Sequence, residues 1–511
     1  MKVVVFMNNT TELVVFIVYL VAMIGIGVFF FLRSRNGGEK EYFLGGRKMG
    51  PWVSALSAGA SDMSAWVLMG LPASVFALGL GQVWIAIGLA LGYALSWIFE
   101  APRLRAFSIA ADDSITIPQY LTNRFKSKSH ALQVVCAVIF LIAYTIYAAS
   151  SIKAAGTLFN TVLGVDANVA MYIAAAIIVG YTFLGGFSAV CWTDFFQGML
   201  MLGALLLAPI FAAANLPVQS ISITDTTPGF FSLFASKKDI VSGLGWGLGY
   251  FGMPHIIIRF MSVKSQKALK RSAKIGITWT TLILIFSVLV GVIGRMYLEY
   301  DEKLVKDELV FLTMVRQLFP SLLSGILLSA ILAAAMSTAD SQLLSAASAF
   351  SSDVYKPLIR KNQTSDKEML WTGRIVVLVI ALLALVLALN PDAGSIMKLV
   401  SNAWGVFGAA FGPAILLSLF WKRFTFKGAI AGITAGALVD IAWLIIHNSR
   451  AALFAVENPD LSYNGIFALY EIVPGFIAGL VAAVVITLID KKPAKEVEVL
   501  FDQATSSDML D

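Results

Sequence analysis

Long apolar runs separated by short polar stretches make up most of this chain. A membrane-spanning helix needs about 20 predominantly apolar residues. Backbone polar groups inside lipid find no water, so each such run is expected to be helical. The pattern predicts an all-α polytopic membrane protein with about thirteen transmembrane helices, near 13–32, 51–78, 82–100, 131–163, 168–185, 191–215, 240–260, 273–298, 320–350, 372–390, 395–421, 428–447 and 467–489.

The basic residues predict how these spans are oriented. Six clusters hold 27 of the 37 Lys and Arg residues, and each cluster follows an odd-numbered span. The clusters lie at 33–48, 103–128, 259–274, 356–374, 422–427 and 491–495. Because Lys and Arg accumulate in cytoplasmic loops, we expect the N-terminus outside the cell and the C-terminus in the cytoplasm, for a multi-pass protein of the cell (cytoplasmic) membrane.

The composition excludes an ordinary water-soluble protein. Hydrophobic residues make up 58% of the chain and charged residues 13%, whereas soluble proteins average about 25% charged residues. The net charge is +6, and the basic residues lie in short clusters between apolar runs. This pattern predicts contact with a lipid bilayer rather than with nucleic acid. We expect residues 1–490 to form one transmembrane domain and residues 491–511 a polar cytoplasmic tail that is disordered.

Several chemistries have no counterpart in the sequence. A phosphate-binding P-loop is missing, which argues against direct ATP drive, and no HExxH or similar catalytic spacing occurs. Cys136 and Cys191 lie in or beside apolar runs and indicate neither a disulfide framework nor a metal centre. We therefore expect a protein that is not an enzyme, carries no cofactor and has no obligate protein partner.

Two of the predicted spans contain helix-weakening residues. Span 51–78 includes Gly70 and Pro72, and span 240–260 has several glycines before Pro254. These are the second and seventh spans, which the count places in opposite orientations. Interrupted helices at matching positions of two inverted halves are a good sequence pointer to a transporter site. The alternative is ordinary close packing of helices through small residues.

Asp62 is the first candidate functional residue, because it lies near the middle of the second span. A carboxylate at that depth is costly and is by default functional. Na⁺ is a hard cation that takes oxygen ligands, which an unwound backbone can supply. The alternative is a structural Asp that caps a broken half-helix.

A second candidate set lies in the ninth span. Ala334, Ser337 and Thr338 are spaced i, i+3 and i+4 and so share one helix face. That face offers two hydroxyl groups, and a carbonyl is freed where Ser or Thr disturbs the helix ladder. The arrangement suits Na⁺, but Ser and Thr also mediate helix packing in membranes.

A third candidate set is the stripe formed by Trp246, Tyr250 and Pro254 in the seventh span. Glycines beside the rings leave space for a small cyclic solute, and an aromatic face attracts a cationic nitrogen. The alternative is aromatic packing against other helices or lipid. Asp194, near the end of its span, is a candidate for ion release or equally for interface anchoring, and Asp440 has no sequence-based explanation.

Three motifs together resemble the sodium/solute symporter family: LSAGASDMSAWVLMGLP at 56–72, WGLGYFGMPH at 246–255 and LSAILAAAMSTADSQLL at 328–344. The resemblance runs from about residue 10 to about residue 490. It implies a LeuT-type fold in which spans two to six and seven to eleven are five-helix inverted repeats. It also implies secondary active transport by alternating access, with Na⁺ as the coupling ion.

The resemblance implies roles for particular residues. It implies Na⁺ coordination by Ala60, Met63, Ala334, Ser337 and Thr338, with Asp62 needed for the ion. It implies a substrate site at Trp246, Tyr250 and Pro254 with Ser64 and Tyr147 nearby, and Asp194 matches an aspartate tied to sodium handling, as an ion exit or second ion site.

Within this resemblance, Trp246, Tyr250 and Pro254 are the residues that imply L-proline as the solute. The alternatives are the same mechanism with pantothenate, a monocarboxylate or a sugar, or a sensor or channel that uses the fold without coupled transport. The tail after residue 490 is too short for a fused signalling domain. Ala65 and Met253 depart from the family pattern of glycine and glutamine, and we expect them to affect the tightness and selectivity of the pocket.

Overall fold

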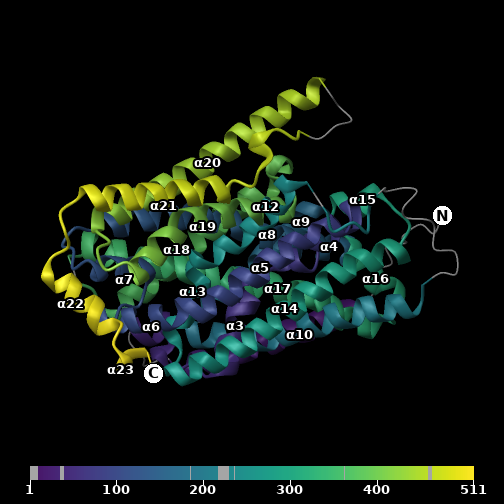
Figure 1. Ribbon diagram of the computed structural model, residues 1–511. Coiled ribbons are helices and arrows are strands. Elements are labelled where there is room, and N and C mark those ends of the chain that lie inside the picture. Colours follow the sequence, from purple (N-terminus) through teal and green to yellow (C-terminus); the bar gives the residue numbers. More distant parts are fainter. Residues whose placement is uncertain are drawn as a thin grey trace.

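A computed structural model describes residues 10–34, 39–184, 186–216, 229–234, 236–361, 363–457 and 463–510. These residues form helices and turns, with one isolated β-bridge between Met49 and Val263. Most of the long helices run in roughly the same direction and form one bundle, with α15 and α16 at one end and α22 and α23 at the other (Figure 1).

The helices of the first half are α1 (Thr10–Ser34), α2 (Glu39–Leu44), α3 (Pro51–Asp62), α4 (Gly70–Leu78), α5 (Val83–Leu95), α6 (Ala101–Ala110), α7 (Ile117–Arg124), α8 (Ala131–Leu163), α9 (Ala167–Leu184) and α10 (Phe187–Ala214). Short 3₁₀ or π segments are η1 (Gly45–Arg47), η2 (Ala65–Val67), η3 (Leu80–Gln82) and η4 (Ser96–Glu100).

The helices of the second half are α12 (Lys237–Gly245), α13 (Pro254–Ser262), α14 (Gln266–Tyr297), α15 (Glu302–Lys306), α16 (Val310–Leu318), α17 (Ser321–Phe350), α18 (Asp366–Leu389), α19 (Ile396–Phe420), α20 (Phe426–Glu457), α21 (Ile472–Ile489), α22 (Lys495–Ala504) and α23 (Ser507–Leu510). The short segments are η5 (Trp246–Phe251), η6 (Ser351–Ile359), η7 (Pro391–Ala393) and η8 (Ile466–Ala468).

Ten helices of the described chain are long and apolar enough to cross a membrane, and the pair Pro51–Asp62 and Ala65–Leu78, bent by 73°, would make an eleventh span. The two other predicted spans take different forms. Span 168–185 corresponds to α9, whose apolar part is shorter, and span 240–260 is divided into α12, η5 and α13. The predicted all-helical membrane architecture is confirmed, and the count of thirteen stays a prediction.

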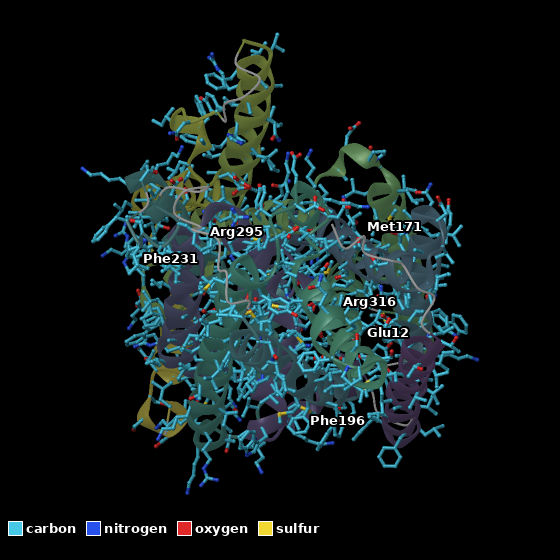
Figure 2. The ribbon with its side chains drawn as sticks, turned by 90° about the vertical axis from the view of Figure 1, so that its right-hand side faces the viewer. Glu12, Met171, Phe196, Phe231, Arg295 and Arg316 are labelled. Atoms are coloured by element: carbon cyan, nitrogen blue, oxygen red, sulfur yellow. The ribbon has the colours of Figure 1, made fainter. Side chains whose placement is uncertain are left out.

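The bundle has a buried centre and an apolar periphery. In the most apolar stretches of Ser321–Ile359 and of α19, 83% of the residues are buried, against 17% for α1. Glu12 anchors the peripheral α1, because its carboxylate pairs with Arg316 at 2.5 Å (Figure 2). Phe196 and Phe231, which are 43% and 47% exposed, lie on the outside of the bundle, as lipid-facing side chains would (Figure 2).

The prediction of a disordered tail is wrong for the described residues, which form α22 and α23. Val497, Leu500 and Ala504 are buried, because their spacing gives α22 an apolar stripe. Phe501 contacts Phe107 of α6 with ring centroids 5.3 Å apart. The helix α20 also continues to Glu457, past the predicted end at 447, and projects beyond the bundle (Figure 1).

Both interrupted spans are broken in the structure. Met63 and Ser64 leave the helical conformation between α3 and η2. In the seventh span, η5 ends before an extended Met253, and Pro254 begins α13. Proline disfavours a helical residue before it and is tolerated at the first helical position, so this break follows from the sequence.

The glycines of the seventh span also serve close packing. A Cβ atom on Gly249 would lie 2.0 Å from Nε1 of Trp404, and one on Gly252 would lie 2.5 Å from the carbonyl oxygen of Phe407. On the other side, a Cβ on Gly247 would lie 2.3 Å from the carbonyl oxygen of Gly88. Close helix packing and helix interruption therefore both occur in this span, since these glycines let η5 fit between α5 and α19.

Candidate functional site

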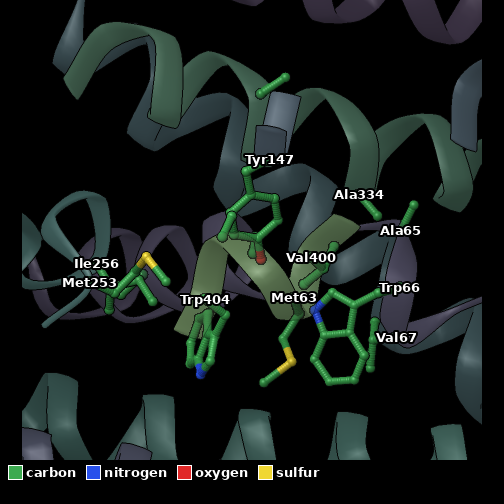
Figure 3. Close-up of a cluster of buried hydrophobic side chains, with 14 of the residues drawn as sticks. Met63, Ala65, Trp66, Val67, Tyr147, Met253, Ile256, Ala334, Val400 and Trp404 are labelled. Atoms are coloured by element: carbon green, nitrogen blue, oxygen red, sulfur yellow. The ribbon is translucent and has the colours of Figure 1, made fainter. Parts of the chain in front are cut away.

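Asp62 lies at the break of the second span and is completely buried. Its Oδ2 accepts a hydrogen bond of 2.5 Å from the hydroxyl of Tyr250 in η5. The hydroxyl of Tyr147 in α8 donates a long hydrogen bond of 3.5 Å to the Asp62 carbonyl oxygen. In Figure 3 the ring of Tyr147 points toward the segment that carries Met63 and Trp66. Asp62 thus joins the two broken spans through its carboxylate and contacts α8 through its backbone carbonyl oxygen.

The segment 334–338 lies directly against the same break. The hydroxyl of Ser337 donates a hydrogen bond of 2.9 Å to the carbonyl oxygen of Ala60 and contacts the Ala334 carbonyl oxygen at 3.3 Å. Residues 60–64 and 334–338 are buried in the centre of the bundle. The structure therefore brings together the two segments that the sequence predicts to share an ion.

Several oxygens here have no hydrogen-bond partner among the described residues. They are Oδ1 of Asp62, Oγ of Ser64 and Oγ1 of Thr338. A buried polar atom without a partner costs free energy unless an ion, water or ligand satisfies it. Oxygens are the ligands that hard cations prefer, so the atoms at the break fit a cation such as Na⁺.

The predicted aromatic stripe borders this region. Tyr250 lies edge-on to Trp404, with ring centroids 5.0 Å apart, and Trp246 lies 5.9 Å from Trp66. The indole N–H of Trp404 donates a hydrogen bond of 2.8 Å to the carbonyl oxygen of Trp246. Tyr250 is fully buried, whereas Trp246 is 5% exposed. The rings thus lead from the buried carboxylate, through Tyr250 and Trp404, to Trp246 at the start of η5.

Pro254 is buried at the start of α13, where the backbone N–H of His255 donates to the hydroxyl of Tyr144 at 3.0 Å. A ring nitrogen of His255 lies 3.2 Å from the carbonyl oxygen of Ser61. The start of α13 is therefore held against both α8 and the break of the second span, which places Pro254 beside the same centre.

Trp66, Trp404 and His255 belong to this site, but the sequence reasoning missed them. Trp66 and His255 lie inside motifs that were recognised, so proximity in sequence to Asp62 and Pro254 could have suggested them. Trp404 lies in a different apolar span. An isolated aromatic residue there carries no sequence signal that separates a site residue from core packing.

A cavity of about 690 Å³ lies on the exposed side of Trp246. We call this cavity the vestibule. Its walls come from α4, Val305, Lys306 and Glu308, the start of α19, residues 444–448 of α20 and Glu471. This is the end of the bundle that carries α15, opposite α22 (Figure 1).

Asp194 lies in a separate cluster. Its Oδ2 pairs with Nη2 of Arg259 at 3.1 Å and accepts a hydrogen bond of 2.7 Å from Ser57. Arg259 also donates 2.5 Å to the hydroxyl of Ser341. The Asp194 and Arg259 side chains are 0% and 1% exposed. Asp194 is therefore not an anchor at the membrane surface but one half of a buried ion pair that joins α3, α10, α13 and α17.

Comparison with known proteins shows the family of this chain. Residues 42–436 match the model of the sodium:solute symporter family. The chain belongs to the sodium:solute symporter family. This symporter is 43% identical over 484 residues to the osmoregulated proline transporter OpuE of Bacillus subtilis (strain 168), covering 94% of each chain. It is 42% identical over 498 residues to a sodium/proline symporter of Staphylococcus aureus (strain USA300 / TCH1516), covering 96% of this chain and 95% of that protein.

Two solved structures share the fold of this symporter. A Na⁺-coupled sialic acid symporter in a substrate-bound outward-open state matches with a TM-score of 0.74 at 20% identity, covering 95% of this chain and 98% of that one. Mhp1, a nucleobase-cation-symport-1 family transporter in a closed conformation, matches with a TM-score of 0.52 at 13% identity, covering 90% of this chain and 97% of that one. Family and relatives are transporters, so the protein is a multi-pass membrane transporter and not an enzyme.

Proposed function

We propose that this chain couples inward movement of Na⁺ to uptake of L-proline. The observation that carries the proposal is the direct contact between the carboxylate of Asp62 and the hydroxyl of Tyr250, because it joins a cation-attracting break to an aromatic pocket. Two relatives that are 43% and 42% identical to this chain are named for proline transport, which supports the choice of solute.

The proposed sodium ligands are the carbonyl oxygens of Ala60, Met63 and Ala334 and the hydroxyls of Ser337 and Thr338. Asp62 would lower the electrostatic cost of bringing a cation into the bilayer centre. The Ser337 hydroxyl donates to Ala60 in the structure. To bind Na⁺ it would turn its proton away and leave both oxygens facing the ion.

The proposed proline site is formed by Trp246, Tyr250 and Pro254, with Ser64 and Tyr147 beside it. An apolar ring would lie against the aromatic faces, and the secondary ammonium group would gain cation–π attraction. The unwound backbone at Met63 and Ser64 offers polar groups for the charged end of the solute. Ion and solute would therefore share the broken second span.

The proposed mechanism is alternating access between two inverted repeats, formed by spans two to six and seven to eleven of a LeuT-type fold. Thirteen spans, an outside N-terminus and a cytoplasmic C-terminus would make residues 1–490 the transport domain and 491–511 a cytoplasmic tail. The vestibule then opens to the outside. Na⁺ and proline are the ligands, in a lipid bilayer, without nucleic acid or an obligate protein partner.

Coupling requires that Na⁺ and proline each raise the affinity for the other, and thermodynamic linkage makes that effect reciprocal. Na⁺ would order the break at Met63 and Ser64 before proline binds. The membrane potential adds about 2.3 kcal/mol per charge per 100 mV to the driving force.

Uptake of labelled proline into proteoliposomes tests the proposal. We expect accumulation with an inward sodium gradient and none when choline replaces sodium, and equal uptake in both buffers would refute sodium coupling. Competition by unlabelled pantothenate, monocarboxylates and sugars separates proline from other solutes. A sodium-independent flux far above carrier turnover would indicate a channel instead.

A further inference from the structure

Asp440 in α20 is a buried carboxylate that the proposed transport site does not use. Its side chain is 0% exposed, and neither Oδ1 nor Oδ2 has a hydrogen-bond partner among the described residues. An ionised carboxylate in such surroundings is very costly, and a protonated one much less so. The residue therefore needs a proton or another cation at this position.

Glu471 is the N-cap residue of α21, a helix that packs against both α19 and α20, and it lies close to Asp440. Both side chains contact Gly405 of α19: a Cβ atom there would lie 2.9 Å from Oδ1 of Asp440 and 3.3 Å from Cγ of Glu471. On α21, a Cβ atom on Gly475 would lie 3.0 Å from Cβ of Asp440. Gly405 and Gly475 thus pack against Asp440 and have no side chain that could donate a hydrogen bond to it.

Glu471 connects this buried carboxylate to water. It is 7% exposed and lines the vestibule. It precedes the span Ile472–Ile489. Burial raises the pKa of Glu471 to about 7, although its own backbone and Lys398 act in the opposite direction. The side chain is therefore suited to exchange protons near neutral pH.

Other titratable and charged groups surround the pair. The vestibule is lined, together with Glu471, by Lys306, Glu308, Lys398 and His447, and Tyr470 precedes Glu471 in the chain. Lys153 on α8 donates a hydrogen bond to the carbonyl oxygen of Gly394. None of these side chains is hydrogen-bonded to Asp440, whose two oxygens lack partners within the described part of the chain.

We propose that Asp440 and Glu471 form a proton-binding site, separate from the sodium and proline sites, that takes its proton from the vestibule. A carboxylate oxygen of Glu471 accepts a proton from a hydronium ion in the vestibule, which leaves as water. That proton then passes to an oxygen of Asp440, as the O–H bond on Glu471 breaks and one on Asp440 forms, and Glu471 returns to its carboxylate form. A proton needs one acceptor, whereas a hard metal cation needs several oxygens, which Gly405 and Gly475 do not provide.

The site has a direct path to the proline pocket. Tyr470, next to Glu471, lies 5.1 Å from Trp246 between ring centroids. Its backbone N–H donates a hydrogen bond of 3.1 Å to Ser242 of α12, and its hydroxyl donates 2.8 Å to the carbonyl oxygen of Ser401. Loss of the proton leaves a buried charge that loosens this segment against Trp246. High external pH therefore weakens solute binding.

Uptake at varied external pH tests this inference in proteoliposomes of fixed internal pH that contain the full chain. Between about pH 5 and about pH 8, we expect the KM for proline of the parent to rise about threefold or more, and that of Asp440→Asn and Glu471→Gln to stay flat. His447→Gln is the matched control, since it removes another titratable group of the vestibule, and it should keep the parent's profile. A flat profile in His447→Gln together with a parental one in Asp440→Asn overturns the proposal.

Infrared difference spectra of the purified protein between the same pH values give a readout that does not depend on transport. We expect a protonated-carboxyl band that Asp440→Asn removes and Glu471→Gln changes, and a band unaffected by both substitutions contradicts the proposal. A tenfold rise of the sodium half-saturation in Asp440→Asn at every pH would show a sodium site instead. Because the spectra need no solute, they still decide the matter if proline proves to be the wrong substrate.

Discussion

Asp62, the last residue of α3, and Asp194, which contacts α3 through Ser57, are two fully buried carboxylates with different partners. Asp194 has a built-in cation, because the Arg259 guanidinium lies 3.1 Å away, and a hydroxyl from Ser57. Asp62 receives one hydroxyl, that of Tyr250, and no guanidinium. In both carboxylates Oδ1 has no hydrogen-bond partner among the described residues, so the cation at Asp194 is what separates them.

The difference indicates a division of labour. A buried carboxylate with its own guanidinium is already neutralised and fastens helices together, whereas one without a cation leaves a site for a cation from outside. We infer that Asp194 stabilises the packing of four helices, and we propose that Asp62 supplies the unbalanced charge for a transported ion. The expectation that Asp194 is an ion exit or second ion site stays a prediction. Substitutions at the two positions should fail in different ways.

The largest effect is expected from Arg259→Met. This change leaves Asp194 buried without a counter-charge, which typically costs about 3–5 kcal/mol, and should appear as a large loss of thermal stability of the purified protein in detergent. The double variant Arg259→Met/Asp194→Leu should recover most of that loss, because an apolar pair of similar volume is often as stable as a buried ion pair. A double variant as unstable as the single one would contradict the structural role of the pair.

Asp62→Asn should leave stability nearly unchanged and remove sodium activation. Loss of a unit charge beside a cation at low effective dielectric is expected to raise the sodium half-saturation of proline uptake by about 100-fold. The matched control is Tyr250→Phe, which keeps the ring and the carboxylate and removes the hydroxyl; it should affect the KM for proline more than sodium activation. Normal sodium activation in Asp62→Asn would contradict the claim that Asp62, unlike Asp194, supplies the charge for a transported cation.

Ser337→Ala should have a smaller effect on the same property. The hydroxyl contacts the carbonyl oxygens of Ala60 and Ala334, and a hydrogen-bonding group next to a charge is worth about 1.5–3 kcal/mol, so sodium half-saturation should rise about tenfold or more. Ser329→Ala is the control on the same helix, because that buried hydroxyl bonds to the Gly325 carbonyl oxygen within α17. Equal effects of the two substitutions would show that Ser337 is only a packing residue.

Much of this architecture was predictable from the sequence, because lipid imposes strong constraints. Runs of apolar residues have to be helices in a membrane, and Pro254 dictates the break before α13. Periodicity placed Ser337 and Thr338 on one face, and the structure puts Ser337 against Ala60.

The remaining features depend on tertiary contacts that no local pattern encodes. In the sequence, Arg259 is only one of the basic residues that predict the orientation of the spans. In the structure it pairs with Asp194, 65 positions away. Trp404 reaches η5 because Gly249 has no side chain, a pairing between two distant spans. The apolar stripe of α22 was overlooked because the tail is polar on average, although Val497 and Leu500 are buried.

Asp113 is a third carboxylate, and unlike Asp62 and Asp194 it lies outside the membrane spans. Its substitution is expected to have the smallest effect. It pairs with Lys40 and with Arg47, whose Nε lies 2.9 Å away. Burial alone would raise the pKa of Asp113, but the two cations outweigh it and lower the pKa below its usual value.

Because that pKa is lowered in the folded state, the stabilisation is complete above about pH 4, the ordinary Asp value, and is lost as the pH falls through the lower folded value. The Asp113 side chain is 45% exposed, so water and salt screen the pair, and Asp113→Asn should cost no more than about 1 kcal/mol. Thermal unfolding at neutral pH and at low and high salt measures this cost. If Asp113→Asn lost as much stability as Arg259→Met, burial in the membrane would not explain the strength of the Asp194–Arg259 pair. A small loss that depends on salt would instead show that this pair is strong because water is absent around Asp194.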